Sequence, residues 1–173
     1  MEALLVIDFH THFLEKGDFS FVKKNAIHLI EVFIENKLPV IAVEHIDDKT
    51  NKPFPLDPFI PKNADKIYSK NRPSAFKETD LQQYLISLGV TELIIIGFNM
   101  EYCILFNAII ANELGFKVTV IEDACATVNN SETYEMPGLD INDFVSTVLH
   151  WSDEVEVLML DEYVWFGLFI ILR

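Results

Sequence analysis

The sequence predicts an α/β protein with three α-β-α layers, in which helices flank a doubly wound, mainly parallel sheet of about six strands, a Rossmann-like arrangement. Short apolar runs alternate along the chain with amphipathic helical stretches. The runs are apolar at consecutive positions, which is typical of strands buried on both faces. Because each parallel pair needs a crossover, helices are expected on both faces of the sheet.

Six segments are predicted strands, the third being the weakest: residues 3–7, 39–43, 66–69, 93–96, 117–121 and 155–160. Three predicted helices lie between them: residues 21–36, 80–88 and 102–114. Gly89 and Gly115 end the last two, and Thr79 with Asp80 is a plausible N-cap. No repeat, low-complexity run or linker interrupts this order, so we expect a single domain over residues 1–173.

Residues 44–63 form a polar segment that carries four of the seven prolines. The segment is too long for an ordinary connection, so we expect a loop that folds over another part of the molecule. In open α/β sheets, ligands bind beyond the carboxyl ends of the strands. The strand assignment therefore also predicts where a binding site lies.

The composition restricts the classes of partner. Half of the residues are apolar and 23% are charged, which suits a chain with a substantial core. The formal net charge is −14 at pH 7. A surface this acidic repels phosphate backbones and anionic lipid, so we expect neither nucleic acid nor a membrane as a main partner. No GxGxxG or GxxxxGK[ST] motif supports a nucleotide-binding domain.

The two cysteines and the chain ends suggest a cytoplasmic protein. Cys103 and Cys125 are too few for a disulfide framework and lie in no CxxC motif, so we expect reduced thiols. The N-terminal residues lack the basic start and cleavage site of a signal peptide. The apolar stretch at residues 163–172 is about half the length of a membrane helix. It either docks on the domain's own core or forms a subunit interface.

Three chemically reactive residue types fall at one predicted edge of the sheet. Asp8 follows the first strand, Lys70 closes the third, and Cys103 lies near the first turn of the helix after the fourth. A nearby ammonium and a helix N-terminus lower a thiol's pKa, and a carboxylate can take its proton. Each residue also has a structural interpretation: a helix or turn cap for Asp8, a solvated side chain for Lys70 and a small core residue for Cys103.

These residues lie in motifs that resemble one enzyme superfamily. The motifs are LLVID ending at Asp8, Lys70 followed by SAF at residues 74–76, IIIGFNMEYCI around Cys103, and GFKVTVIEDACAT from Gly115. In this order, over roughly residues 3–130, they resemble the isochorismatase-like cysteine hydrolases. The resemblance implies a doubly wound parallel sheet, a small-molecule substrate, no cofactor, and a homodimer or homotetramer.

The resemblance also implies the roles of individual residues. Asp8, Lys70 and Cys103 would form an Asp-Lys-Cys triad that hydrolyses a small amide-like C–N bond through a thioester. A cis peptide would join Phe98 to Asn99, and the backbone N–H groups of Asn99 and Cys103 would form an oxyanion hole.

Substrate contacts are expected from side chains around the mouth of the site. We expect them from His10, Phe13 and Phe76. Cys125 is interpreted as structural, and Glu101 is expected at the helix start without carrying a proton.

Several positions depart from the family pattern. His10 replaces the usual Gln two residues after the Asp, Met100 replaces a frequent Thr, and Asn99 replaces a small or aliphatic residue. Where the nicotinamide-hydrolysing branch has a metal cluster, this chain has adjacent Glu44 and His45. Adjacent strand residues point to opposite faces, so we expect no bound metal, which argues against nicotinamidase activity. The alternative to an enzyme is a non-catalytic ligand-binding or assembly protein of the same fold.

Overall fold

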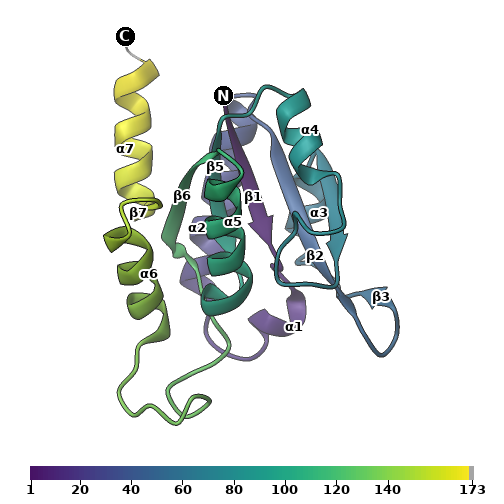
Figure 1. Ribbon diagram of the computed structural model, residues 1–173, viewed down its shortest axis with the longest axis vertical. Coiled ribbons are helices and arrows are strands. Elements are labelled where there is room, and N and C mark those ends of the chain that lie inside the picture. Colours follow the sequence, from purple (N-terminus) through teal and green to yellow (C-terminus); the bar gives the residue numbers. More distant parts are fainter. Residues whose placement is uncertain (172–173) are drawn as a thin grey trace.

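A seven-stranded sheet forms the centre of the molecule in the computed structural model, which describes the backbone of residues 1–171 and the side chains of residues 1–165 (Figure 1). Six strands are parallel, in the spatial order β4-β2-β1-β5-β6-β7. Their bounds are β1 Glu2–Ile7, β2 Val40–Asp47, β4 Lys66–Lys70, β5 Glu92–Gly97, β6 Lys117–Cys125 and β7 Glu156–Leu158. The seventh strand, β3 (Lys52–Pro53), pairs antiparallel with the end of β2.

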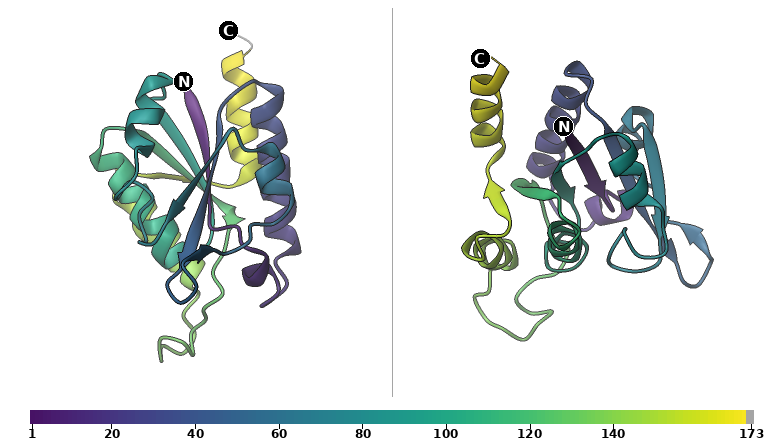
Figure 2. Two further views of the ribbon diagram at one scale, coloured as in Figure 1. Left: turned by 90° about the vertical axis from the view of Figure 1, so that its right-hand side faces the viewer. Right: turned by 45° about the horizontal axis from the view of Figure 1, so that its top comes forward.

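Helices cover both faces of this sheet (Figure 2). On one face lie α2 (Ser20–Glu35), α3 (Phe59–Asn63) and α7 (Leu160–Ile171). On the other lie α4 (Leu81–Ser87), α5 (Leu105–Glu113) and α6 (Ile141–Trp151). The predicted fold class is therefore confirmed: the chain forms three layers around a doubly wound, mainly parallel sheet.

The central strands are apolar on both faces because both faces are covered. In β1 every residue from Ala3 to Ile7 is buried, and in β5 every residue from Leu93 to Gly97 is buried. Removing these side chains from water on both sides of the sheet is the main favourable contribution to the fold. It also explains why the apolar runs lacked alternation in the sequence.

The chain reverses its winding between β1 and β5. The connection after β1 passes through α2 on one face, whereas the connection after β5 passes through α5 on the other. The two strands are neighbours, with Ile7 opposite Gly97. This topological switch point leaves a crevice at the carboxyl ends of β1 and β5, where ligands of doubly wound sheets bind.

The segment 44–63 differs from the single long loop that its composition suggested. Strand β2 continues to Asp47, two residues of β3 pair with its end, and α3 begins at Phe59. The β2–β3 hairpin projects beyond the sheet in Figure 1. The prolines and polar residues here mark a short hairpin and helix, which also explains why seven strands were found rather than about six.

The start of the C-terminal helix docks on the domain itself. Tyr163 is half-buried, its ring stacks on Phe33 of α2, and its hydroxyl lies 3.0 Å from the Glu2 carboxylate. Of the two alternatives for the apolar tail, docking on the domain's own core therefore applies to its first part. The side chains of residues 166–173 lie outside the described part of the structure. Among the described residues, no helix has the length and apolar character needed to span a membrane.

Candidate active site

Asp8 lies at the carboxyl end of β1 in a backbone conformation that side-chain-bearing residues rarely adopt. Its φ is +50°, and its N–H donates to Val43 O at 2.9 Å. Residues in this region carry strain of about 1–3 kcal/mol and are found most often where the surroundings enforce them. The side chain is almost completely buried, and its Oδ1 has no hydrogen-bond partner among the described residues.

Lys70 brings the three predicted catalytic side chains together. It is the last residue of β4, and its side chain is fully buried. Its Nζ lies 2.6 Å from Asp8 Oδ2 and 3.3 Å from Cys103 Sγ. The carboxylate, ammonium and thiol therefore form one contact cluster, which we call the Asp8–Lys70–Cys103 cluster.

Cys103 is positioned by the turn after β5. Gly97 has φ +127° and lies so close to β1 that a Cβ there would be 1.9 Å from Ile7 O. The Phe98–Asn99 peptide is cis, and the next residues form the π-helical turn η1 (Met100–Ile104), which contains Cys103. This tight path places the thiol beside β1 and β4.

The pKa of Cys103 differs from the sequence-based expectation. Burial raises it, the neighbouring Asp8 carboxylate raises it further, and Lys70 lowers it by less, so that it reaches about 12. The expectation of a lowered pKa was therefore wrong, because the thiol lies deeper than its place near a helix start indicated. Cys103 is a neutral thiol at pH 7.

Asp8, in contrast, is a carboxylate at neutral pH. Burial raises its pKa, but the adjacent His10 ring, the Lys70 ammonium and the Cys103 thiol lower it, and the net direction is downward. The cluster thus holds a thiol beside a carboxylate that can accept its proton.

A pocket of about 250 Å³ opens onto this cluster. Its lining is mostly apolar and aromatic and comprises Asp8, Phe13, His45, Phe54, Pro73, Asn99, Tyr102 and Cys103. The volume is slightly below the roughly 300–1,000 Å³ that is usual for small-molecule sites, so the pocket suits a compact ligand.

Of the three expected substrate contacts, only Phe13 lines this pocket. His10 is fully buried, and its Nε2 accepts a hydrogen bond from the His45 N–H at 3.2 Å. The Phe76 ring stacks on Phe116, with 6.3 Å between centroids. His10 therefore supports the end of β2, and Phe76 packs against a core residue.

Comparison with known proteins agrees with this architecture. The model of the isochorismatase domain matches residues 2–151. The chain belongs to the isochorismatase family. The uncharacterized family protein YddQ of Bacillus subtilis is 31% identical over 139 residues, covering 72% of this chain and 77% of YddQ.

Two other proteins show the range of the isochorismatase family. An Arabidopsis thaliana protein described as a "Probable inactive nicotinamidase" is 27% identical over 189 aligned positions, covering 88% of this chain and 95% of that protein. The structure of nicotinamidase PncA from Bacillus subtilis superposes with a TM-score of 0.72 at 23% identity, covering 90% of this chain and 98% of that one. The similarity to nicotinamidase PncA shows that the two proteins share a fold.

The metal cluster found in one branch of the family does not fit the residues present here. Glu44 Oε1 accepts a hydrogen bond from Ser69 Oγ at 2.7 Å, whereas His45 Nδ1 lies 3.2 Å from the Lys70 ammonium. The two adjacent side chains thus have different partners, and one of these partners is a cation. Within the described residues, no group of three or more His, Cys, Asp or Glu side chains is arranged to hold a metal ion.

Two residues that sequence reasoning did not assign to the site hold its framework. Asn107 is fully buried; its Oδ1 accepts from Ala75 N–H, and its Nδ2 donates to Pro73 O and Cys103 O. Glu101 lies in the first turn of η1, as the sequence predicted, and its Oε1 lies within 3.0 Å of donors on Thr127, Asn129 and Tyr134, which the sequence did not indicate. An Asn in an otherwise apolar helical stretch was the available signal for Asn107.

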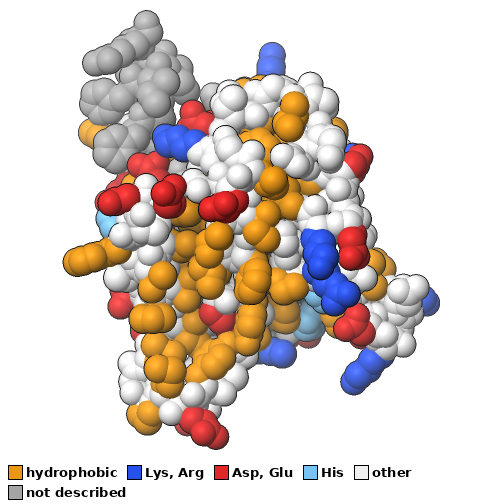
Figure 3. Space-filling view, in the orientation of Figure 1, with side chains coloured by type: hydrophobic (Ala, Val, Ile, Leu, Met, Phe, Trp, Pro, Cys, Tyr) orange, Lys and Arg blue, Asp and Glu red, His pale blue; other side chains and the backbone are white. Residues whose placement is uncertain are grey.

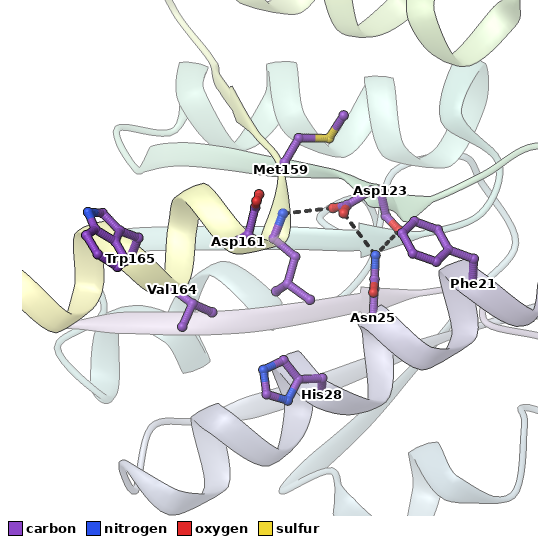
Figure 4. A pocket seen from close by; sticks show the side chains of 9 residues that line it. Phe21, Asn25, His28, Asp123, Met159, Asp161, Val164 and Trp165 are labelled. Carbon is purple, nitrogen blue, oxygen red and sulfur yellow. Dashed lines mark hydrogen bonds between the residues drawn. The ribbon is translucent and has the colours of Figure 1, made fainter.

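A larger pocket, of about 620 Å³, lies away from the cluster between α2 and the start of α7 (Figure 4). Its two most buried polar side chains are already paired with each other. Asp123 accepts from Leu160 N–H at 2.8 Å and from Asn25 Nδ2 at 2.9 Å. These bonds join β6, α7 and α2, so the polar groups here have a structural role.

Proposed function

We propose that this chain is a cysteine hydrolase that cleaves a C–N bond in a compact amide or amide-like compound, with Cys103 as the nucleophile. The observation that carries the proposal is the contact of Lys70 Nζ with both Asp8 Oδ2 and Cys103 Sγ, at 2.6 and 3.3 Å. Membership of the isochorismatase family supports the same class of reaction.

In the first half-reaction, Asp8 takes the thiol proton while Cys103 Sγ adds to the carbonyl carbon of the substrate. Because the thiol is neutral at rest, proton removal and addition occur together. The protonated Asp8 then gives the proton to the leaving nitrogen as the C–N bond breaks. The products of this stage are an amine and a thioester on Cys103.

In the second half-reaction, Asp8 takes a proton from water, and the resulting hydroxide adds to the thioester carbonyl. Collapse of this adduct breaks the C–S bond, releases a carboxylic acid and returns the proton to Cys103. The Lys70 ammonium keeps Asp8 ionised between steps and balances the negative charge of the thiolate.

The backbone N–H groups of Asn99 and Cys103 are our proposed oxyanion hole. Asn99 lines the pocket beside Cys103, and its N–H donates no hydrogen bond among the described residues. A backbone N–H without a partner at a ligand site is suited to a developing oxyanion, and losing one such donor typically costs about 100- to 1,000-fold in rate.

The test is release of ammonia or amine from a panel of small amides, including nicotinamide, benzamide, short aliphatic amides and N-carbamoyl compounds. We expect turnover of at least one compound, a loss of about 1,000-fold or more in Cys103→Ala, and a thioester mass adduct in rapidly quenched wild type. Cys125→Ala is the matched control, because Cys125 is buried away from the pocket. Turnover that survives in Cys103→Ala would contradict the proposal.

A non-catalytic ligand-binding protein is the second candidate, favoured by the raised pKa of Cys103 and by the relative described as inactive. It predicts that compounds of the same panel bind with micromolar affinity but are recovered intact. Calorimetric binding without any product would favour this candidate.

A further inference from the structure

His45 lines the pocket but has no role in the reaction proposed above. It lies near the end of β2, directly opposite Lys70 of β4 in the register of the sheet. Its ring Nδ1 lies 3.2 Å from Lys70 Nζ. Its backbone N–H donates to the buried His10 ring, which fixes the main chain at this point.

An ammonium group has three N–H donors and no acceptor. The Lys70 side chain is fully buried, so each of these donors needs a partner from the protein. Three acceptors surround it: Asp8 Oδ2 at 2.6 Å, His45 Nδ1 at 3.2 Å and Cys103 Sγ at 3.3 Å. Each acceptor comes from a different element, so together they fix the position of Nζ.

The contact also fixes the protonation state of His45. Because Lys70 can only donate, Nδ1 must carry a lone pair, and the ring proton must lie on Nε2. Burial and Lys70 lower the pKa of His45, His10 also lowers it, and Asp8 and Asp48 act in the opposite direction with the smaller effect. The ring is therefore neutral at pH 7.

We propose that His45 is a positioning residue for Cys103 chemistry: its Nδ1 accepts the third hydrogen of Lys70 and thereby holds the ammonium between Asp8 and the thiol. The inference rests on the proposed function and deepens it. Without this acceptor, one N–H is unpaired in a buried site, and Nζ is free to swing about the Asp8 carboxylate, whose Oδ1 has no hydrogen-bond partner among the described residues, and away from the sulfur. The thiolate then loses electrostatic stabilisation.

The test compares His45→Asn with His45→Leu, and the readout is the rate at which iodoacetamide alkylates Cys103 at pH 8.5, followed by peptide mass spectrometry. Asn can offer an amide oxygen near the position of Nδ1, whereas Leu offers no acceptor. We expect His45→Asn to react within about threefold of wild type. We expect His45→Leu to react about tenfold more slowly, the change for an ammonium that recedes by roughly 2 Å.

His150→Asn is the matched control, because His150 is an exposed histidine of α6 and should leave the rate unchanged. A His45→Leu rate equal to that of wild type would overturn the inference. Equal slowing in both His45 variants would also overturn it, since that pattern reflects lost ring packing and not a lost acceptor.

The wild-type protein provides a second measurement that needs no variant. In ¹⁵N spectra of histidine-labelled protein at pH 7.5, His45 should be the neutral tautomer with its proton on Nε2. A proton on Nδ1 would overturn the inference even if His45→Leu fails to fold. Neither measurement uses turnover, so failure of amide hydrolysis and failure of the His45 contact remain distinguishable.

Discussion

At the scale of single residues, the cluster depends on charges that oppose one another. Asp8 raises the pKa of Cys103, and Lys70 lowers it, while burial contributes the largest upward shift. In the reaction that we propose, the resting thiol is therefore neutral and becomes nucleophilic only as Asp8 accepts its proton. Such an arrangement limits side reactions of the thiol with solvent oxidants, which attack the thiolate.

The alkylation rate of Cys103 should reflect this balance through its dependence on pH. With a pKa of about 12, the thiolate fraction rises about tenfold for each pH unit between pH 7 and 10, so the rate should rise with the same slope and reach no plateau in this range. A plateau below pH 8 would show that the pKa of Cys103 is lowered instead.

Replacement of Asp8 should separate proton transfer from thiol reactivity. Asp8→Asn removes a negative charge beside the sulfur, so the pKa of Cys103 falls and alkylation at pH 8 becomes about tenfold faster. The same variant lacks the proton acceptor and should lose turnover by about 10²- to 10⁴-fold. An unchanged turnover number would exclude Asp8 as the base.

At the scale of elements, the segment from β5 through η1 to α5 determines where Cys103 lies. Strand β5 pairs with β1 along its whole length, and Gly97 ends it against Ile7. The register with β6 shifts between Ile95 and Gly97, which lets the chain leave the sheet toward the pocket. Asn107 of α5 then ties η1 to the loop that contains Pro73 and Ala75.

Gly97→Ala should therefore cost far more stability than Gly89→Ala. A Cβ at Gly97 would be 1.9 Å from Ile7 O, whereas a Cβ at Gly89 would meet nothing within 4 Å, and both glycines have positive φ. We expect a loss of about 1–2 kcal/mol in the free energy of unfolding for Gly89→Ala and about 4 kcal/mol or more for Gly97→Ala. Urea unfolding measures both, and equal losses would contradict the close approach of β5 to β1.

At the scale of the whole molecule, a strongly acidic chain exposes large apolar side chains on adjacent helices. Phe106 and Ile109 of α5 and Phe144, Val148 and Trp151 of α6 are each at least 45% exposed. Apolar side chains gather over these two helices in Figure 3. An apolar face of this kind suits contact with another copy of a chain whose net charge is −14, because charged surfaces of like sign repel.

We propose that this face forms the interface of the homodimer or homotetramer that the family resemblance led us to expect. Phe144→Glu should weaken association by about 3 kcal/mol, roughly a hundredfold in Kd, because a buried interface would have to accommodate a charge. Sedimentation at micromolar concentration measures this, with Ile34→Glu on the opposite face of the sheet as the control. If the wild-type protein is still a monomer at 100 times this micromolar concentration, the proposal is contradicted.

The sequence by itself determined the six parallel strands, the helices α2, α4 and α5, and the placement of Asp8, Lys70 and Cys103 at one edge. These features depend on local periodicity and on where each apolar run ends, and both are properties of short segments. Even so, β3, α3, α6 and α7 were not predicted. Two paired residues or one helical turn leave no periodic signal, whereas α6 has one, with Ile141, Val145 and Leu149 buried at a spacing of four, and it was overlooked.

Only the tertiary structure decided which side chains surround the thiol and how that thiol titrates. The contact of His45 with Lys70, the burial of His10 and the packing of Phe76 on Phe116 all join segments far apart in the chain. The pKa of Cys103 depends on the depth of burial and on the summed charges of such neighbours. Neither the depth of burial nor the sum of the neighbouring charges depends on the residues adjacent in sequence. The pKa of Cys103 could therefore be predicted only from the folded structure.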